Sequence, residues 1–139
     1  MISFEITRLI PQREPILMVD RLERVEGDSA GTLFCIREDN FFLEADGRLA
    51  EIGVIEHIAQ SASALFGYKA ALAGVSEPEV RYIGEVKKFR CYRCPAVGET
   101  LHTVITVEME VEGITLVHGE TRVGSELIAE TQMKLSDKT

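Results

Sequence analysis

The spacing of apolar residues changes near Pro78 and keeps its new period through the rest of the chain. Before it, residues 48–73 repeat apolar side chains at the three- and four-residue spacing of an α-helix, and Gly74 marks the expected end of that helix. After it, apolar and polar side chains alternate, which is typical of β-strands. The alternating segments are residues 80–92, 100–110, 114–123 and 127–135. The sequence therefore predicts one long helix followed by four strands in an antiparallel meander.

The N-terminal third contributes further elements. Residues 3–10 predict a short helix or turn, residues 16–25 and 29–38 predict the two strands of a hairpin around Gly27, and residues 39–47 predict a loop. A helix that is apolar around much of its circumference has to be enclosed, and a curved sheet of about six strands is the available cover. We expect a single α+β domain with the hotdog fold, in which an antiparallel sheet wraps around one long central helix.

Composition narrows the class of protein and its partners. The 139 residues fit one domain, and a content of 45% hydrophobic and 27% charged residues is ordinary for a globular protein. The formal net charge of -8 disfavours nucleic acid and anionic membrane surfaces as partners. The N-terminal sequence lacks the basic start and long apolar run of a signal peptide, and polar residues interrupt the long helix too often for a membrane span. We therefore expect a cytoplasmic protein.

The cysteines do not predict a metal or redox centre from their spacing. Cys35, Cys91 and Cys94 are an odd number, which does not describe a disulfide framework and fits a reducing compartment. Cys91 and Cys94 form one C-x-x-C pair, but a structural zinc site needs four ligands, and no second Cys or His pair follows at a suitable spacing. The pair also ends a strand and does not begin a helix, where a redox thiol would have a lowered pKa. The sequence therefore predicts packing cysteines, no metal and no cofactor.

Glu56 is the main candidate for chemistry, because it is an acid on an otherwise apolar face of the predicted helix. At about 3.6 residues per turn, Ile52, Gly53 and Gln60 share its face, so its carboxylate is expected to point where the helix packs. An unpaired carboxylate in an apolar place is costly or takes up a proton, and acids in such places are often catalytic. The alternative is that Glu56 only hydrogen-bonds Gln60 and stabilises the core or a dimer.

Two segments carry a resemblance to a known family. The segment LIPQREPILMVDRL resembles the N-terminal segment of bacterial 3-hydroxyacyl-acyl-carrier-protein dehydratases, and GVIEHIAQSA resembles the helix that carries their catalytic Glu, with Glu56, Ala59 and Gln60 in register. The approach to the helix, FFLEADGRLAEIGVIEHIAQ, is similar to that of the branch associated with aryl polyene pigment biosynthesis. The resemblance covers nearly the whole chain. It implies a hotdog dimer in which a His and a Glu from different protomers share acid-base catalysis on a 3-hydroxyacyl thioester.

The chain departs from this family at one catalytic position. The family places its His in a loop motif HFPGxPVxPG before the helix, whereas residues 39–48 contain no histidine, and Gln12 stands where the N-terminal motif has another His. His57 adjoins Glu56 in sequence but does not share its face of the helix. The remaining histidines are expected on the sheet surface: His102 and His118. Asp46 is the nearest replacement for the loop His, unless it serves as the N-cap of the helix.

The resemblance also implies contacts with substrate and carrier. Around the helix the candidate substrate-binding residues are Gly53, Gln60 and Gly47. Gly47 lies near the predicted start of the helix, where free backbone N–H groups can polarise a thioester carbonyl. Tyr82 and Gly84 lie on the strand that lines the dimer interface and acyl tunnel of the family, although Tyr82 is also compatible with an ordinary alternating strand. A basic patch is the predicted docking surface for an acidic carrier protein: Lys87, Lys88, Arg90 and Arg93.

We therefore predict a 3-hydroxyacyl-acyl-carrier-protein dehydratase, or a dehydratase-like subunit, that acts on thioesters of acyl carrier protein or coenzyme A. We expect a homodimer, or a heterodimer with another hotdog subunit. Two alternatives stay open at this point. One is a hotdog thioesterase, in which a carboxylate activates water or attacks the thioester. The other is a non-catalytic subunit that pairs with a complete dehydratase.

Overall fold

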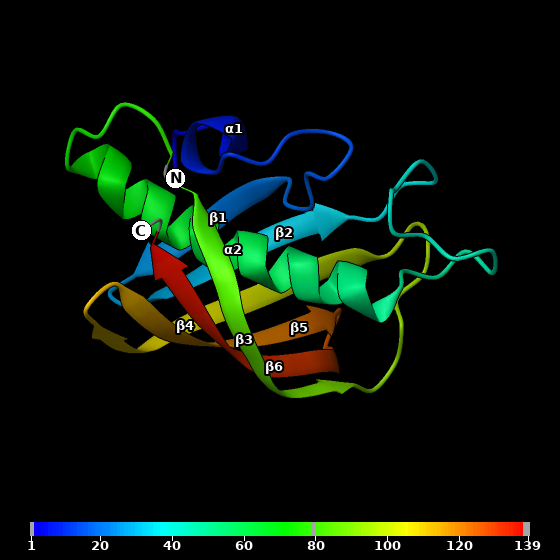
Figure 1. Cartoon of the computed structure of the whole chain (residues 1–139). Helices are drawn as coiled ribbons and strands as arrows, with labels where there is room; N and C mark the ends of the chain where they lie inside the picture. Colours follow the sequence, from blue (N-terminus) through cyan, green and yellow to red (C-terminus); the bar gives the residue numbers. More distant parts are fainter. Residues whose placement is uncertain (1, 79, 138–139) are drawn as a thin grey trace.

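A long helix, α2 (Glu51–Leu72), lies against a curved six-stranded antiparallel sheet, which confirms the predicted hotdog fold (Figure 1). The computed structural model describes residues 2–78 and 80–137. A short helix, α1 (Ile6–Leu9), packs on α2, and α2 contacts each strand from β1 to β5. The strands in chain order are β1 (Arg21–Glu26), β2 (Ser29–Cys35), β3 (Arg81–Cys91), β4 (Thr100–Val111), β5 (Ile114–Val123) and β6 (Glu126–Asp137).

The strand order in the sheet is β1-β2-β4-β5-β6-β3, so the predicted four-stranded meander is wrong in one place. Hairpins join β4, β5 and β6 as predicted, whereas β3 pairs with β6 and not with β4. Residues 92–99 separate β3 from β4, a longer connection than the roughly two to five residues of an ordinary hairpin. This connection carries the chain across to β2, with which β4 pairs. As a result, β3 is an edge strand.

Helix α2 begins at Glu51 and not at Arg48, because the chain before it is held in an extended conformation. The N–H group of Leu49 donates to the carbonyl of Pro95 at 2.8 Å, and Arg48 forms an isolated β-bridge with Ala96. These pairings fix the loop before α2 to the loop after β3. The start of the helix is therefore held in place by the β3–β4 connection.

Two glycines allow α2 to lie close to its neighbours. A Cβ atom at Gly67 would lie 1.8 Å from the carbonyl oxygen of Leu9, and one at Gly119 would lie 2.6 Å from Cγ2 of Ile58. No side chain fits at such distances, so α1 and β5 approach α2 because these positions lack a side chain. The core around the helix is made of large, fully buried side chains, each of which contributes about 1.5 to 3 kcal/mol of transfer free energy. They include Phe34, Leu65, Leu101, Ile105, Ile128 and Met133.

Large apolar side chains remain exposed on β3 and at the start of α2. On β3, Tyr82 is 51% exposed and Ile83 is 40% exposed. At the start of α2, Ile52 is 65% exposed, and Phe41 in the preceding loop is 60% exposed. Exposed apolar patches are typical of surfaces that bind a partner, and each of these two groups is a candidate for such a surface. In the described part of the chain, neither helix combines the length and the apolar character needed to cross a bilayer.

Candidate functional site

Gln60 is fully buried, and its side-chain amide ties α2 to the N-terminal segment. Its Oε1 atom accepts a hydrogen bond from the N–H group of Met18 at 2.6 Å. Its Nε2 atom donates to the carbonyl of Ile16 at 2.8 Å and to Oε2 of Glu56 at 2.7 Å. Because these bonds occupy backbone groups of Ile16 and Met18, β1 begins at Arg21 and not at Ile16 as predicted. The amide has both of its hydrogens and its oxygen engaged within the chain.

Glu56 lies at the border between the packed and the exposed faces of α2 and is half-buried. Gln60 holds its Oε2 atom, whereas its Oε1 atom accepts no hydrogen bond from residues 2–78 or 80–137. Gly53 and Gln60 on the same face are buried as predicted, but Ile52 is 65% exposed, so the prediction that this whole face packs within the chain is wrong. The carboxylate is held in a fixed orientation with one oxygen free, next to an open apolar surface.

His57 points the other way, into the core, and does not share the face of Glu56. Its Nδ1–H donates to the carbonyl of Met18 at 2.6 Å, because a carbonyl oxygen can only accept. Its Nε2 atom therefore accepts from the hydroxyl of Thr103 at 2.7 Å, and Thr103 accepts from Thr121 at 2.7 Å. Burial lowers the pKa of His57 to about 4, so the imidazole is neutral at physiological pH. All its polar atoms are paired, which makes it a structural residue.

The polar cluster around His57 was not identified from the sequence, although a signal exists. On β4, Leu101, Thr103 and Ile105 point to the same face and are all buried. A threonine between two core residues on the inward face of a strand needs a hydrogen-bond partner, because burying an unpaired hydroxyl is costly. A polar residue facing inward on the neighbouring helix is the partner to look for, and His57 is that residue.

Asp46 neither caps α2 nor bonds Glu56. Its Oδ1 atom accepts a hydrogen bond from the N–H group of Arg48 at 3.0 Å, and the side chain is exposed. The N-cap residue is Ala50, which offers no side-chain hydrogen bond. The expectation of an N-terminal cap is therefore wrong, because the helix begins farther along the chain. Within residues 2–78 and 80–137, no hydrogen bond joins Asp46 to Glu56.

The free amides at the helix start lie beyond Gly47. The N–H group of Gly47 donates to the carbonyl of Glu44, and that of Arg48 is taken by a side chain, so neither is free. One turn later, the N–H groups of Glu51 and Ile52 meet no hydrogen-bond acceptor in the described part of the chain. These two amides form the positive end of the α2 dipole and can stabilise a negatively charged oxygen.

The three remaining substrate-binding candidates have clear structural surroundings. A Cβ atom at Gly53 would lie 2.7 Å from Cβ of Phe42, so this glycine lets the loop before α2 pack on the helix. The pairing of β3 with β6 shifts register between Ile83 and Glu85, and Gly84 lies at this shift. A glycine inside a strand often marks such a bulge. Tyr82 is half exposed on the same edge strand. Contact of these residues with a substrate stays a prediction.

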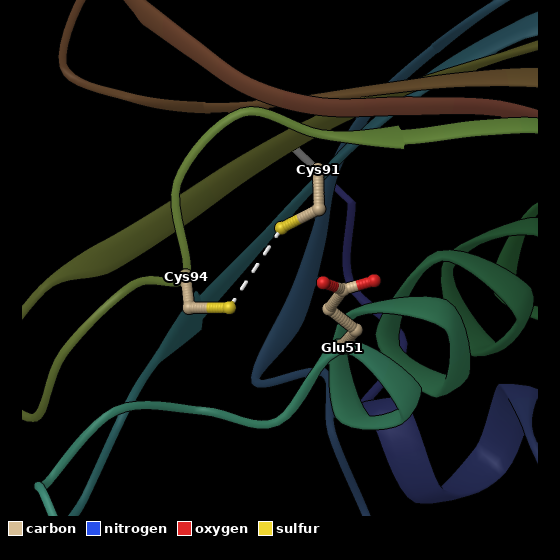
Figure 2. Close-up of side chains that lie close together, drawn as sticks. All are labelled: Glu51, Cys91 and Cys94. Atoms are coloured by element: carbon tan, nitrogen blue, oxygen red, sulfur yellow. Dashed lines mark hydrogen bonds between the residues drawn. The ribbon is translucent and has the colours of Figure 1, made fainter.

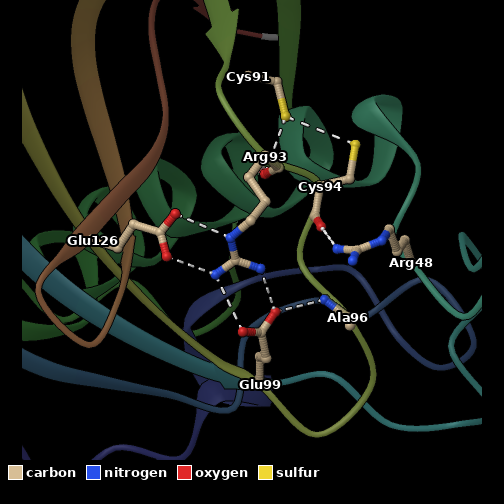
Figure 3. Close-up of polar contacts among 7 residues, drawn as sticks. All are labelled: Arg48, Cys91, Arg93, Cys94, Ala96, Glu99 and Glu126. Carbon is tan, nitrogen blue, oxygen red and sulfur yellow. Dashed lines mark hydrogen bonds and ion pairs between the residues drawn. The ribbon is translucent and has the colours of Figure 1, made fainter.

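The four basic residues predicted to dock a carrier protein fall into two groups. Arg93 is already paired (Figure 3): its guanidinium lies 2.8 Å from a carboxylate oxygen of Glu99 and 3.0 Å from one of Glu126. The guanidinium holds the pKa of both carboxyl groups below their ordinary value. The other three have no acid within ion-pair distance in the described part of the chain: Lys87, Lys88 and Arg90. These three carry the positive charge that remains available on β3.

Among the described residues, two groups of side chains have the composition of a metal site. They are Glu51, Cys91 and Cys94, and His118, Glu120 and Glu130, each with its candidate ligand atoms within 4.8 Å of one another. The second group is already engaged, because Glu120 pairs with Arg122 at 2.9 Å and with His118 at 3.1 Å. The first group brings Glu51 to the C-x-x-C pair, a contact that the spacing of the cysteines did not predict.

Comparisons with known proteins agree on the family. The chain matches the family model of the ApeP-like proteins, described as ApeP dehydratase, over residues 4–138. The 3-hydroxyacyl-[acyl-carrier-protein] dehydratase FabZ of Syntrophotalea carbinolica is 30% identical over 135 residues, which cover 94% of this chain and 90% of that protein. A chain of the dehydratase heterocomplex ApeI:P from Xenorhabdus doucetiae superposes with a TM-score of 0.91 at 16% identity, covering 99% of this chain and 93% of that chain.

A second class of hotdog protein is also structurally similar. A proposed thioesterase from Ralstonia eutropha, related to phenylacetic acid degradation, superposes with a TM-score of 0.64 at 14% identity. The match covers 84% of this chain and 83% of that chain. Identities this low establish the shared fold alone. The family model, in contrast, spans nearly the whole chain, and the FabZ relative is similar in sequence as well. This chain belongs to the ApeP-like dehydratase family.

Proposed function

We propose that this chain is a subunit of a 3-hydroxyacyl-acyl-carrier-protein dehydratase and that it contributes Glu56 to a site completed by a second hotdog subunit. The observation that carries the proposal is the geometry of Glu56 and Gln60. A buried amide, fixed by the backbone, holds one carboxylate oxygen and leaves the other free beside an open apolar surface. The fully buried His57, in contrast, has each ring nitrogen engaged within the chain.

The reaction assigns a clear role to such an acid. Dehydration breaks the C2–H bond and the C3–O bond of the acyl chain, forms the C2=C3 double bond and releases water. One group must accept the C2 proton, and another must give a proton to the departing hydroxyl. In our proposal Glu56 protonates the hydroxyl through its free Oε1 atom, and a histidine of the second subunit accepts the C2 proton. Gln60 is a positioning residue, because it orients Glu56 without reaching the substrate.

A second subunit is needed for two reasons. The loop before α2 carries no histidine between residues 39 and 48, so a homodimer has no loop histidine to act as the base. Ile52 lies beside Glu56, and Tyr82 and Ile83 lie on the edge strand β3. All three side chains are apolar and exposed, which suits the docking of another hotdog chain. The structural similarity to a chain of a dehydratase heterocomplex supports a heterodimer over a homodimer.

The substrate arrives on a carrier that recognises positive charge. Lys87, Lys88 and Arg90 on β3 form no ion pair with residues 2–78 or 80–137 and offer this charge to acidic acyl carrier protein or to the phosphates of coenzyme A. In our proposal the N–H groups of Glu51 and Ile52, which meet no acceptor among the described residues, polarise the thioester carbonyl. The acyl chain is of the fatty-acid or aryl polyene type. The three free cysteines support a reducing, cytoplasmic location.

Thioester hydrolysis is the second candidate function. The same free amides at the start of α2 would stabilise the oxyanion of a tetrahedral intermediate, and Glu56 would then activate water. The structural similarity to a proposed thioesterase is compatible with this reaction. Hydrolysis does not need the absent loop histidine, so it predicts activity of the chain alone, whereas dehydration predicts activity only with a partner.

One assay separates these functions. Purified chain is supplied with a 3-hydroxyacyl thioester, alone and with a hotdog subunit that carries the loop histidine, and both enoyl product and free thiol are measured. We expect enoyl formation only in the mixture, and its loss with Glu56→Gln. Glu38→Gln is the matched control, because Glu38 is an exposed acid with no hydrogen bond to Glu56 or Gln60 among the described residues.

The proposal has clear ways to fail. Release of free thiol by the chain alone, lost with Glu56→Gln, would establish the thioesterase instead. Full activity of the mixture containing Glu56→Gln would leave the chain as a non-catalytic subunit.

A further inference from the structure

Two thiols and a carboxylate meet where β3 ends and α2 begins (Figure 2). The Sγ atoms of Cys91 and Cys94 are 3.9 Å apart, and a carboxylate oxygen of Glu51 and both sulfurs all lie within 4.8 Å of one another. In Figure 2 the Glu51 carboxylate is directed toward the thiols. The cysteines are half-buried and Glu51 is exposed, so the cluster is accessible from solvent.

We propose that Cys91, Cys94 and Glu51 bind one thiophilic divalent cation, with Zn²⁺ as the expected ion and water as its fourth ligand. Two sulfurs bound to one tetrahedral Zn²⁺ at about 2.3 Å lie about 3.8 Å apart. The observed separation of 3.9 Å is nearly the same, so the thiols are already placed for a shared ion. A mixed sulfur and oxygen ligand set suits Zn²⁺ better than Mg²⁺ or Ca²⁺, which prefer oxygen ligands alone.

The loop that carries Cys94 is fixed by contacts around the cluster (Figure 3). Arg93, between the two cysteines, pairs with Glu99 and Glu126, and the N–H group of Ala96 donates to Glu99 at 2.8 Å. On the other side, Nη1 of Arg48 donates to the carbonyl of Cys94 at 2.8 Å. Such supporting contacts hold metal ligands in position before the ion arrives. The guanidinium of Arg48 also brings positive charge close to Cys94.

The electrostatics of the cluster favour a cation. Burial, the neighbouring Cys94 and the charge of Glu51 together raise the pKa of the Cys91 thiol to about 11. The same groups that oppose ionisation in the protein alone become ligands when a divalent ion replaces the thiol protons. Thiol–disulfide exchange is less favoured here, because a thiol with a raised pKa supplies little of the reactive thiolate. The inference does not depend on Glu56 or on the dehydratase reaction.

Metal titration of the reduced, chelator-treated full chain tests the site. Co²⁺ serves as a spectroscopic probe for Zn²⁺, because thiolate ligands give a charge-transfer band in the near ultraviolet and tetrahedral Co²⁺ gives intense visible bands. We expect both signals to saturate at one ion per chain and to disappear when Zn²⁺ is added. The affinity for Zn²⁺ is then measured by competition with a chromophoric chelator. The absence of a charge-transfer band from the wild-type chain would overturn the proposal without any variant.

Variants identify the ligands. Cys91→Ser combined with Cys94→Ser is expected to abolish the charge-transfer band, and Cys35→Ser is the control, since it removes the third cysteine outside the cluster. Glu51→Gln is expected to weaken Zn²⁺ affinity by about tenfold or more. Loss of a carboxylate that only supports a metal ligand already lowers metal affinity by about tenfold, and loss of a ligand should cost at least as much.

Glu44→Gln is the control for Glu51→Gln, because Glu44 is an exposed acid near the start of the same helix. Zn²⁺ is also expected to raise the melting temperature of the wild-type chain but not of the double cysteine variant. Unchanged Zn²⁺ affinity in the double cysteine variant would overturn the site. Unchanged affinity in Glu51→Gln would overturn the three-ligand assignment.

Discussion

Glu56 and His57 are neighbours in the sequence, but α2 places their side chains in opposite environments. His57 is fully buried, and each of its ring nitrogens has a hydrogen-bond partner within the chain. Glu56 is half-buried, and only one of its oxygens has a partner in the described residues. The polar group on the inner side of the helix is thus fully paired within the single chain, whereas the one on the outer side keeps an oxygen without a partner in the described residues.

This difference shows where to look for function in a small domain. Both residues are polar groups on a helix that packs against a sheet. Distant segments hold His57 directly, whereas Glu56 is held by Gln60 on the same helix, which is in turn bonded to the N-terminal segment. Burial alone does not separate a structural group from a functional one, because the more deeply buried residue is the structural one. The separation comes from counting hydrogen bonds that remain to be made.

The largest expected effect is on activity, through Glu56. Glu56→Gln keeps the size of the side chain and can still pair with Gln60, but it removes the proton donor and should lower the dehydration rate by about 10²- to 10⁴-fold. The free energy of unfolding should stay the same or rise slightly, since functional acids are often maintained at a cost in stability. Turnover with the histidine-containing partner and thermal melting measure the two quantities. A loss of stability that matches the loss of activity would assign Glu56 a structural role.

The opposite result is expected for His57. His57→Ala leaves the carbonyl of Met18 without a donor and the hydroxyl hydrogen of Thr103 without an acceptor, and it creates a cavity, so the free energy of unfolding should fall by about 3 to 5 kcal/mol. Denaturant unfolding measures this change. The fraction that stays folded should keep most of its activity in the mixture, as judged per folded molecule. Loss of turnover in fully folded His57→Ala would break the distinction between the two sides of the helix.

The sequence predicts local features of this site well, because they depend on helix and strand periods. The change of period near Pro78 separates the helix from the later strands, and the four-residue spacing places Gln60 next to Glu56. It also places His57 on another face. These relations survive because a helix fixes them whatever the rest of the chain does.

Relations between distant segments could not be predicted in the same way. The pairing of β3 with β6 depends on the path of residues 92–99, which no local pattern specifies. The same path brings Cys91 and Cys94 to Glu51. Glu51 precedes them by about forty positions in the sequence, and spacing rules for metal ligands do not apply at such a separation. The exposure of Ile52 was also missed, because periodicity shows a shared face but not whether the chain itself covers it.

A smaller effect is expected from pH, and it sharpens the assignment of His57. Its pKa is about 4 in the folded chain and near the ordinary 6.5 when unfolded, so the unfolded chain binds a proton first as the pH falls. Stability is therefore complete above pH 6.5, and about 3 kcal/mol should be lost between pH 6.5 and pH 4. Glu99 and Glu120 have lowered pKa values and add their own losses only below about 4.5, so the upper part of the window reports His57.

Denaturant midpoints across this window measure that effect. His57→Gln should flatten the dependence in the upper part of the window, because glutamine does not titrate. His102→Gln is the matched control, since His102 lies half exposed on β4, and it should keep the slope. An unchanged slope in His57→Gln would show that another group causes the pH dependence.

The smallest effect tests whether the inner cluster is complete through its hydroxyl groups. Thr103→Val keeps the shape of the side chain but removes the donor to Nε2 of His57 and the acceptor for Thr121, so we expect a loss of about 1 to 3 kcal/mol in the free energy of unfolding. Thr106→Val, at an exposed position on the same strand, should change it by about 0.5 kcal/mol or less. If Thr103→Val lowers the free energy of unfolding no more than Thr106→Val does, the hydrogen bond between His57 and Thr103 contributes nothing measurable to stability. The inner side of α2 would then hold a polar group without an effective partner, as the outer side does. Combining Thr103→Val with His57→Ala decides the matter, because two residues that act through one hydrogen bond should together cost less than the sum of their separate losses.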